Sequence, residues 1–500
     1  MFKMLAGFGS AALLLHLLTN GRYGYFRDEL YFMACGDHLA WGYVDFAPLA
    51  AWLVHVNRAI LGDSLHALRF LPAVSAAAKI VLSGMIVREL GGHRFAILLA
   101  CLCVLLAPVN LILDTLYSMN SFEPLFWMGC VYVLLVALRR GEPKLLLWFG
   151  LLAGLGLENK HSMAFFGIAL VLGLLFTPAR RLFANRWMWA AAALAFVIFL
   201  PNLIWQIQHH WPTLEDLANV RRTHKNVELP PLPFLWAQTL MLNPASVLVW
   251  LPGLAFLVFD PETRRYRFLG ITYLVLLGLM MALHGKDYYL APAYPMLFAA
   301  GGVFWEQWSA EKSRWLRIAL PAAVALVALP TVPFVLPILP VDTFLRYQSA
   351  IGLEPPRTEA GHTGPLPQHF GDMFGWPEMV EKIAQVYNAL PPQDRAKAAI
   401  YAGNYGEAGA VDFFGARYGL PKAISAHQTY FYWGPRQYTG EVMILLQGNR
   451  RAAEQRCFMF EDGPEVGQPY AMGEEHYQIF VCRGLRPPLQ YLWPELKHWN

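Results

Sequence analysis

Charged residues are scarce in this sequence. Asp, Glu, Lys and Arg together make up 15% of its 500 residues, whereas 56% are hydrophobic. Soluble proteins carry about 25% charged residues, so this deficit excludes an ordinary soluble enzyme and predicts a chain whose solvent is lipid. The formal net charge of +4 is also small, and we therefore expect no nucleic-acid partner.

Cysteine is scarce as well, and its pattern does not indicate a metal site. The six cysteines show no Cys-x-x-Cys motif and no Cys/His cluster with metal-ligand spacing. A divalent metal is possible as a cofactor, but it has no clear ligand set. Cys101, Cys103 and Cys130 lie in apolar runs, where we expect them to pack. Cys457 and Cys482 lie in a polar part and can form a disulfide if that part faces an oxidising compartment.

Long apolar runs dominate the first two thirds of the chain. A transmembrane helix needs roughly 20 apolar residues, within a range of about 17 to 25. Runs near this length occupy residues 4–20, 70–87, 95–113, 122–138, 145–157, 163–177, 187–205, 234–259, 268–284, 291–308 and 315–338. We therefore expect about eleven transmembrane helices. The first lacks a convincing cleavage site, so we interpret it as an uncleaved span.

Basic residues occur in every second loop between these runs. They are Arg88, Arg94, Arg139, Arg140, Lys144, Arg180, Arg181, Arg186, Arg264, Arg265, Arg267, Lys312, Arg314 and Arg317. Cytoplasmic loops carry an excess of Lys and Arg. The alternation therefore predicts a multi-pass protein of the cytoplasmic (inner) membrane, with a cytoplasmic N-terminus and a long external first loop at 21–69.

The composition changes near residue 340, after a proline-rich stretch (Pro330 to Pro340, then Glu354-Pro355-Pro356). The remaining pattern predicts helices at 376–390 and 406–418 and strands at 398–402, 422–425 and 442–446. We therefore expect an α-helical polytopic membrane protein with a transmembrane domain at 1–340 and a small C-terminal α/β extracytoplasmic domain at 341–500.

A polar turn joins the first of these strands to the helix that follows it. Its sequence is Asn404-Tyr405-Gly406-Glu407. Open α/β sheets often bind ligands at such strand-to-helix turns. A tight turn with a helix cap explains the same residues, and both interpretations stay open.

Two adjacent carboxylates, Asp28 and Glu29, follow the first apolar run. An ionised carboxylate outside the membrane can accept a proton from an acceptor hydroxyl or amine. The alternative is an acidic pair at a helix N-terminus, where the helix dipole favours negative charge. For Glu29, the sequence leaves a second base and a structural cap open.

Four short motifs in order carry a resemblance to a known family. They are Asp28-Glu29-x-x-Phe32, then Asp45-Phe46-Ala47-Pro48-Leu49, then Glu123-Pro124-Leu125, and finally Lys286-Asp287-Tyr288-Tyr289-Leu290-Ala291-Pro292. The chain resembles the type C membrane glycosyltransferases, in the bacterial branch of the protein O-mannosyltransferases and lipid A aminoarabinose transferases. Two positions depart from the family's pattern, because Ala47 replaces a proline and Glu123 stands where aspartate is commoner.

The resemblance implies a fold, a donor and roles for particular residues. The type C fold is implied, with a sugar on a polyprenyl phosphate as donor, and the sequence shows no Gly-rich nucleotide-binding loop. Asp28 is implied as the base that acts on the acceptor, with Glu29 beside it. Lys286 is implied as a ligand of the donor phosphate, although a lysine at a helix end can also reach toward the interface. The residues expected to support the active site are Asp45, Glu123, Tyr31, Asp287 and Tyr288.

Two further groups of cations lie in loops expected to be external. Lys160 and His161, between two apolar runs, are candidates for holding the phosphate because charge so close to the bilayer is costly. Arg221 and Arg222, followed by His224 and Lys225, break the inside-positive pattern. This group is either a set of donor-phosphate ligands or a patch for lipid headgroups.

Two functions compete. The first is an inverting glycosyltransferase that moves a sugar from a polyprenyl-phosphate donor to a lipid, glycan or protein acceptor on the external face of the membrane. The second is a polytopic transporter or flippase of lipid-linked sugars without transferase activity. Transporters typically show internal repeats and charges at the bilayer midplane, whereas here we find no repeat and the polar residues lie at external ends. The first function is therefore favoured.

Overall fold

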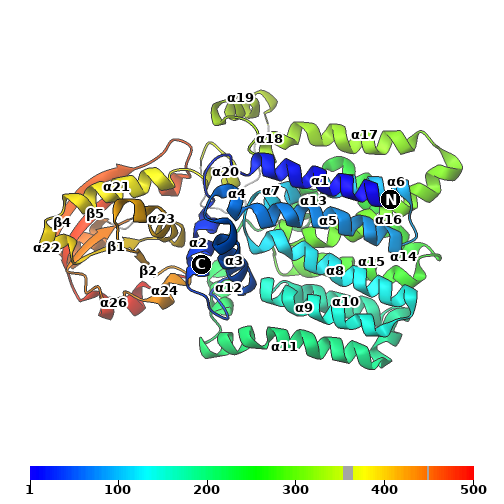
Figure 1. Ribbon diagram of the computed structural model, residues 1–500, viewed down its shortest axis with the longest axis horizontal. Coiled ribbons are helices and arrows are strands. Elements are labelled where there is room, and N and C mark those ends of the chain that lie inside the picture. The colour runs from blue at the N-terminus through cyan, green and yellow to red at the C-terminus, as the bar shows by residue number, and fades with distance from the viewer. Residues whose placement is uncertain (353–363, 447–449, 500) are drawn as a thin grey trace.

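The computed structural model describes residues 1–352, 364–446 and 450–499. It shows a bundle of helices and, at one end of the bundle, a smaller part built around a sheet (Figure 1). The short helices α2, α3, α4 and α12 lie between the two parts. The residues Glu354-Pro355-Pro356 of the proline-rich stretch lie outside the described residues.

Helices account for almost all regular structure before residue 352. They are α1 (Phe2–Thr19), α2 (Arg27–Asp37), α3 (Leu49–Leu61), α4 (Leu65–Leu68), α5 (Phe70–Glu89), α6 (Arg94–Leu105), α7 (Pro108–Thr115), α8 (Met119–Arg140), α9 (Leu146–Asn159), α10 (Met163–Leu175), α11 (Arg186–Gln208), α12 (Pro212–Arg222), α13 (Pro231–Met241), α14 (Val247–Phe259), α15 (Arg267–Ala282), α16 (Tyr294–Lys312), α17 (Leu316–Ala328), α18 (Val332–Val335) and α19 (Val341–Ile351). Short 3-10 helices join them at Pro143–Leu145, Pro178–Ala184, Pro244–Ser246, Arg264–Tyr266, Asp287–Ala293 (η5) and Leu329–Thr331.

Local signals set several helix ends. Ser118 caps α8 by accepting a hydrogen bond from the N–H of Asn120 at 3.2 Å, and Asn185 caps α11 through the N–H of Trp187 at 3.0 Å. At the other end of α8, Gly141 adopts the left-handed conformation with φ of 67°. These residues end the apolar helices close to the boundaries that the sequence predicts.

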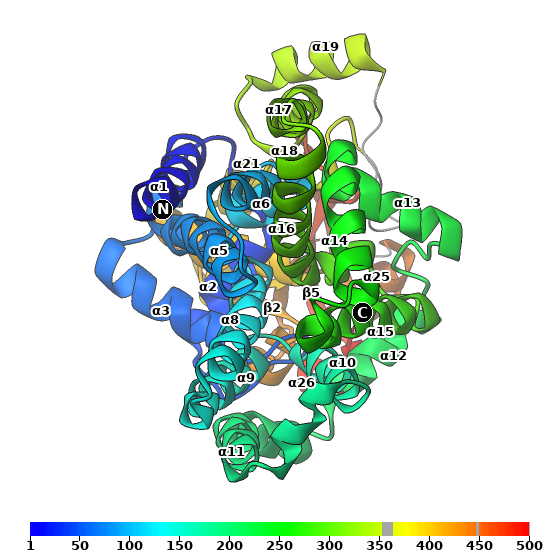
Figure 2. The ribbon, with the colours of Figure 1, turned by 90° about the vertical axis from the view of Figure 1, so that its right-hand side faces the viewer.

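Within the described residues, six helices are long and apolar enough to cross a membrane, and up to nine spans result if each of three bent helix pairs counts as one. The six are Phe2–Thr19, Leu65–Glu89, Met119–Arg140, Arg186–Gln208, Arg264–Ala282 and Leu316–Val335. The helix α9, with 14 residues, is not among them. The count of eleven therefore stays a prediction. In Figure 2, which views the bundle from the end opposite the sheet, α16 lies near the centre and α11 at the periphery.

Two expected spans are not continuous helices. The run 95–113 is divided into α6 and α7, which meet at 57°, and the run 234–259 is divided into α13 and a second segment bent by 101°. Pro108 and Pro244 stand just after the breaks, because proline lacks the N–H that would continue the preceding helix. Asn243 adds a positive φ of 77° at the sharper bend.

The C-terminal part is a five-stranded mixed sheet covered by helices. Its strands are β1 (Ala398–Ala402), β2 (Ile424–Ser425), β3 (Val442–Leu445), β4 (Cys457–Val466) and β5 (Tyr477–Leu485), in the order β2-β1-β3-β5-β4. Its helices are α20 (Gln368–Gly371), α21 (Trp376–Ala389), α22 (Pro392–Arg395), α23 (Tyr405–Phe414), α24 (Tyr430–Trp433), α25 (Arg450–Arg456) and α26 (Leu489–Leu496), with 3-10 helices at Gly415–Tyr418 and Gly473–Glu475.

The parallel part of this sheet agrees with the predicted α/β pattern. β1 pairs in parallel with both β2 and β3, whereas β5 pairs antiparallel with β3 and β4. The sequence analysis missed β4 and β5. It also placed the second helix at 406–418, where the structure has α23 followed by one 3-10 turn.

Alternate residues of each strand enter two different cores. On one face, Ile400 and Ile444 pack with α21 and α23 in a core that also contains Leu30 of α2. On the other face, Ala399 and Met443 pack against α26. The first core therefore joins the sheet to α2, at the edge of the helical bundle.

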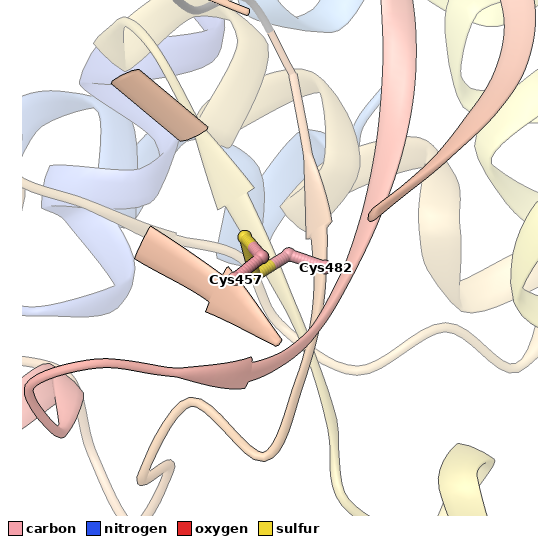
Figure 3. Close-up of a disulfide and its surroundings, with 2 residues drawn as sticks. All are labelled: Cys457 and Cys482. Atoms are coloured by element: carbon pink, nitrogen blue, oxygen red, sulfur yellow. A yellow bond between two sulfur atoms is a disulfide. The ribbon is translucent and has the colours of Figure 1, made fainter. Parts of the chain in front are cut away.

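One disulfide links the two antiparallel strands. Cys457 at the start of β4 is bonded to Cys482 in β5, 25 residues later, with the Cα atoms 5.5 Å apart (Figure 3). The pairing that the sequence allowed is thus formed. Cys101, Cys103 and Cys130 are free and buried, as expected for packing residues.

Candidate active site

The candidate site begins at the first turn of α2. This helix starts at Arg27, so Asp28 and Glu29 both lie where the helix dipole favours negative charge. The backbone N–H of Phe26 donates to Glu29 Oε2 at 2.9 Å. Glu29 therefore caps the helix, which is the structural alternative that the sequence left open for this residue.

Glu29 is also half of a buried ion pair. Arg69 Nε and Nη2 each donate to one of its carboxylate oxygens at 2.8 Å, and the N–H of Tyr117 donates to Oε1 at 2.8 Å. The side chains of Glu29 and Arg69 are both 0% exposed. A charge held in this way is compensated and shielded from substrate, so the arrangement favours a structural role for Glu29.

Asp28 has the opposite environment. Its side chain is 37% exposed. The hydroxyl of Tyr405, from the first turn of α23, donates to Asp28 Oδ1 at 2.7 Å. The contact with a cation is longer, because Arg27 Nε lies 3.9 Å from the same oxygen. Asp28 is therefore an accessible carboxylate oriented by a neutral donor, which suits a general base.

Asp45, on the loop between α2 and α3, lies beside Tyr31. The Tyr31 hydroxyl donates to Asp45 Oδ1 at 2.9 Å and lies 2.7 Å from Thr429 Oγ1. Burial raises the pKa of the Asp45 carboxyl to about 7, and the negative charges of Asp216 and Asp28 act in the same direction. Asp28, Asp45 and Asp216 thus share one electrostatic environment.

Asp216, on α12, is a member of the site that the sequence analysis missed. Gln428 Nε2 donates to its Oδ1 at 2.9 Å. Burial raises the pKa of Asp216, and this is opposed by the bond from Gln428 and then by the charges of Lys225 and Lys286. The sequence signal was poor because Asp216 falls on the polar face of α12.

The predicted residues Lys286, Asp287 and Tyr288 lie at the start of η5. The N–H of Tyr288 donates to Asp287 Oδ1 at 2.8 Å, which fixes the Asp287 side chain in the first turn of η5. Burial raises the pKa of Asp287, and the neighbouring ammonium of Lys286 opposes the shift. Lys286 therefore acts on two carboxyls, the half-buried Asp287 and the buried Asp216.

Glu123 and Lys160 form an ion pair between α8 and the end of α9. Lys160 Nζ donates to Glu123 Oε2 at 2.8 Å and to Asn120 Oδ1 at 2.8 Å, and it lies 4.4 Å from the ring centroid of Tyr289. The hydroxyl of Ser162 donates to the other oxygen of Glu123. The carboxylate of Glu123 thus already balances the charge of Lys160. This arrangement favours a structural role for Lys160 over the binding of a phosphate.

The remaining predicted residues of this group each have contacts within the protein. His161 Nε2 lies 2.9 Å from Asn202 Oδ1, and Asn202 in turn donates to the carbonyl of Trp41 at 2.8 Å. Arg221 and Arg222 are exposed, and their guanidinium groups contact the carbonyl of Leu283 at 3.5 Å and the side chain of Asn219 at 3.0 Å, respectively.

The side chains of the candidate site, as far as the structure describes them, do not form a ready set of metal ligands. In the part of the chain that the structure describes, no group of three His, Cys, Asp or Glu side chains is placed to hold a metal ion. Asp28, Asp45 and Asp216 instead use hydrogen bonds to Tyr405, Tyr31 and Gln428.

Part of the chain matches a known family. The family model described as dolichyl-phosphate-mannose-protein mannosyltransferase matches residues 45–205. The lipid A galacturonosyltransferase RgtD of Rhizobium johnstonii is 28% identical over 203 residues, which cover 39% of this chain and 41% of RgtD. The similarity thus spans less than half the length of this curated relative.

The fold has a counterpart among solved structures. ArnT from Cupriavidus metallidurans, in its apo state and bound to undecaprenyl phosphate, superimposes with a TM-score of 0.62 in both cases. The sequence identity is 14%, and the superposition covers 96% of this chain and 98% of ArnT. At this identity the likeness shows the fold alone. Together with the family model and RgtD, it confirms the resemblance to the type C membrane glycosyltransferases.

Proposed function

We propose that this protein is an inverting glycosyltransferase that moves a sugar from a polyprenyl-phosphate donor to a lipid acceptor of the lipid A type. RgtD is described as a lipid A galacturonosyltransferase and ArnT was solved with undecaprenyl phosphate, and both support this choice of substrates. The observation that carries the proposal is Asp28, a 37% exposed carboxylate oriented by a tyrosine hydroxyl.

The proposed reaction is a single displacement. The acceptor hydroxyl approaches Asp28, which takes its proton as the new bond from acceptor oxygen to sugar C1 forms. The bond from C1 to the phosphate oxygen breaks on the opposite face, so the configuration at C1 inverts. Polyprenyl phosphate leaves with the electron pair of that bond.

Cations near Asp216 are the proposed partners of the leaving phosphate. The positive charges of Lys225 and Lys286 both lower the pKa of Asp216, which indicates that these two cations belong to the same region. An ammonium group placed where negative charge develops stabilises the transition state. We assign the donor phosphate to Lys286 and Lys225, and we assign Lys160 to the ion pair that joins α8 to α9.

Sidedness supports the same proposal. Basic residues in alternate loops favour a cytoplasmic N-terminus in the inner membrane. The disulfide between Cys457 and Cys482 suits a C-terminal domain, at 341–500, that lies in an oxidising compartment such as the periplasm. The site at the junction of the helices and the sheet would then face the external surface, where lipid-linked donors and lipid acceptors meet.

The test is mass spectrometry of envelope glycolipids from a deletion strain complemented with variants. We expect wild-type protein to restore a missing sugar and Asp28→Asn to leave it missing. Asp37→Asn is the matched control, because Asp37 lies on the same helix, is 44% exposed and binds Arg58 at 2.7 Å. Restoration of every glycan by Asp28→Asn would overturn the role of Asp28. Accumulation of untransferred lipid-linked sugar on the cytoplasmic side would instead indicate a transporter.

A further inference from the structure

Asp28 is oriented by a residue from the other end of the chain. The hydroxyl of Tyr405 donates to it at 2.7 Å across a separation of 377 residues. The Tyr405 ring also stacks on Tyr31, with centroids 4.6 Å apart, and on His427, with centroids 5.0 Å apart. The position of the Tyr405 hydroxyl is thus set by rings on both sides.

A second turn of the C-terminal part reaches the other two carboxyls. Gln428 donates to Asp216 at 2.9 Å. Thr429 lies 2.7 Å from the hydroxyl of Tyr31, which donates to Asp45 at 2.9 Å. Each carboxyl of the site is therefore linked, directly or through one tyrosine, to a side chain that follows a strand of the sheet.

Both turns leave the same edge of the sheet. Tyr405 follows β1, and Gln428 and Thr429 follow β2, its parallel neighbour. The carboxyl ends of adjacent parallel strands meet at one edge, which is where open α/β sheets present functional side chains. The backbone N–H of Tyr405 donates to His427 Nδ1 at 3.1 Å and joins the two turns.

Close packing holds this edge against α2. The helix α23 approaches α2 so closely that a Cβ atom added at Gly409 would lie 2.9 Å from the backbone of Leu30. Arg27 secures the contact at one end, because its Nη1 donates to Glu474 at 2.7 Å and its N–H donates to the carbonyl of Asp372 at 3.1 Å. The Tyr405 hydroxyl thus has little freedom relative to Asp28.

A neutral donor orients a carboxylate without cancelling its charge. The Tyr405 hydroxyl carries no charge, and the guanidinium of Arg27 approaches Asp28 only to 3.9 Å while it binds Glu474 at 2.7 Å. Tyr405 can therefore orient Asp28 and leave it able to accept a proton.

We propose that Tyr405 is a positioning residue for Asp28, so that the C-terminal part completes the acceptor side of the active site by docking its β1 and β2 turns on α2. This inference rests on the proposed transferase function. Tyr405 acts through Asp28 and makes no bond to substrate. Gln428 and Thr429 hold the neighbouring carboxyls in the same manner.

The experiment compares purified, reconstituted Tyr405→Phe with Tyr387→Phe. A lipid extract of the deletion strain supplies donor and acceptor, and mass spectrometry gives the initial rate. Tyr405→Phe keeps the stacked ring and loses only the hydroxyl, so we expect the rate to fall about 10-fold. Tyr387 is the control because its hydroxyl donates to the carbonyl of Arg395 at 3.3 Å, away from the site, and its rate should change less than about 2-fold.

A double-mutant cycle separates positioning from a structural effect. In an Asp28→Asn background, Tyr405→Phe should change the residual rate by less than about 2-fold, because residues that act as a unit are non-additive. An equal loss in both backgrounds would overturn the inference. So would a Tyr405→Phe rate equal to that of Tyr387→Phe. If wild-type protein transfers no sugar from the extract, the proposed function itself fails.

Discussion

Two carboxylates near the junction of the helical bundle and the sheet, Glu123 and Asp28, differ in the groups that bind them. Glu123 is paired with Lys160 at 2.8 Å and both side chains are at most 10% exposed. Asp28 receives a hydroxyl from Tyr405 at 2.7 Å and is 37% exposed. A carboxylate balanced by a buried ammonium fixes the positions of two helices, whereas one held by a neutral donor keeps its capacity to accept a proton. The partner of each carboxylate, more than its position in the sequence, therefore distinguishes a structural role from a catalytic one.

The largest effect should come from Asp28. Asp28→Asn removes the proposed base and leaves the hydrogen bond from Tyr405 possible, so we expect kcat to fall about 1,000-fold with the melting temperature unchanged. Rate measurements on reconstituted protein and a thermal melt check the two parts. A large loss of stability in this variant would show that Asp28 has a structural role, as proposed for Glu123.

Glu29, the neighbour of Asp28, should behave in the opposite way. Glu29→Gln removes the negative charge that compensates the buried guanidinium of Arg69. We therefore expect the free energy of unfolding to fall by about 3–5 kcal/mol. The measurement is thermal unfolding in detergent. Glu215→Gln is the control, because Glu215 pairs with Lys497 at 2.6 Å but is 41% exposed, and it should cost less than about 1 kcal/mol. If Glu29→Gln and Glu215→Gln unfolded with the same free energy, the ion pair between Glu29 and Arg69 would not be structural.

Glu123 tests the other side of the comparison. Glu123→Gln leaves the Lys160 ammonium uncompensated, and we expect a loss of about 2–3 kcal/mol in unfolding free energy with little change in kcat. Lys160→Met added to this variant should recover part of that loss, because no buried charge then remains. If Lys160→Met alone raised the KM for the donor, Lys160 would instead be a ligand of the donor phosphate.

Asp45 should make stability depend on pH. In the folded protein its pKa is raised to about 7 from 3.8, so between these values the folded state holds a proton that the unfolded chain has lost. The contribution of Asp45 to stability therefore falls as pH rises through this window. Asp45→Asn should leave the melting temperature unchanged near pH 4 and raise stability by about 1–2 kcal/mol above pH 7. A stabilising effect at acidic pH alone would contradict the sign.

The smallest effect should come from the exposed arginines of α12. Leu214 and Leu217 on the same helix are 59% and 52% exposed, which favours a lipid-headgroup patch over a phosphate site. Arg221→Gln with Arg222→Gln should change the donor KM less than about 2-fold and weaken binding to anionic liposomes at low salt. A 10-fold rise in KM would instead place these arginines at the donor.

The fold was more predictable than the site. Most apolar helices and three strands could be predicted from the sequence, because each rests on a local pattern, whereas the disulfide between Cys457 and Cys482 was only one possibility. The sequence analysis missed the hairpin of β4 and β5, which lacks clear alternation. The sequence named Asp28, Asp45 and Lys286, which stay predictions, but it named neither Asp216 nor the pairing of Lys160 with Glu123.

The sequence by itself determined the runs of apolar residues, the helix caps and the placement of an acidic pair at the start of α2. These features depend on neighbours within a few residues, through hydrogen bonds along the helix and transfer of side chains to lipid. Only the tertiary structure decided that Glu29 meets Arg69, 40 residues away, and that Asp28 meets Tyr405, 377 residues away. Two adjacent carboxylates acquired different properties because packing brought a guanidinium to one and a phenol to the other.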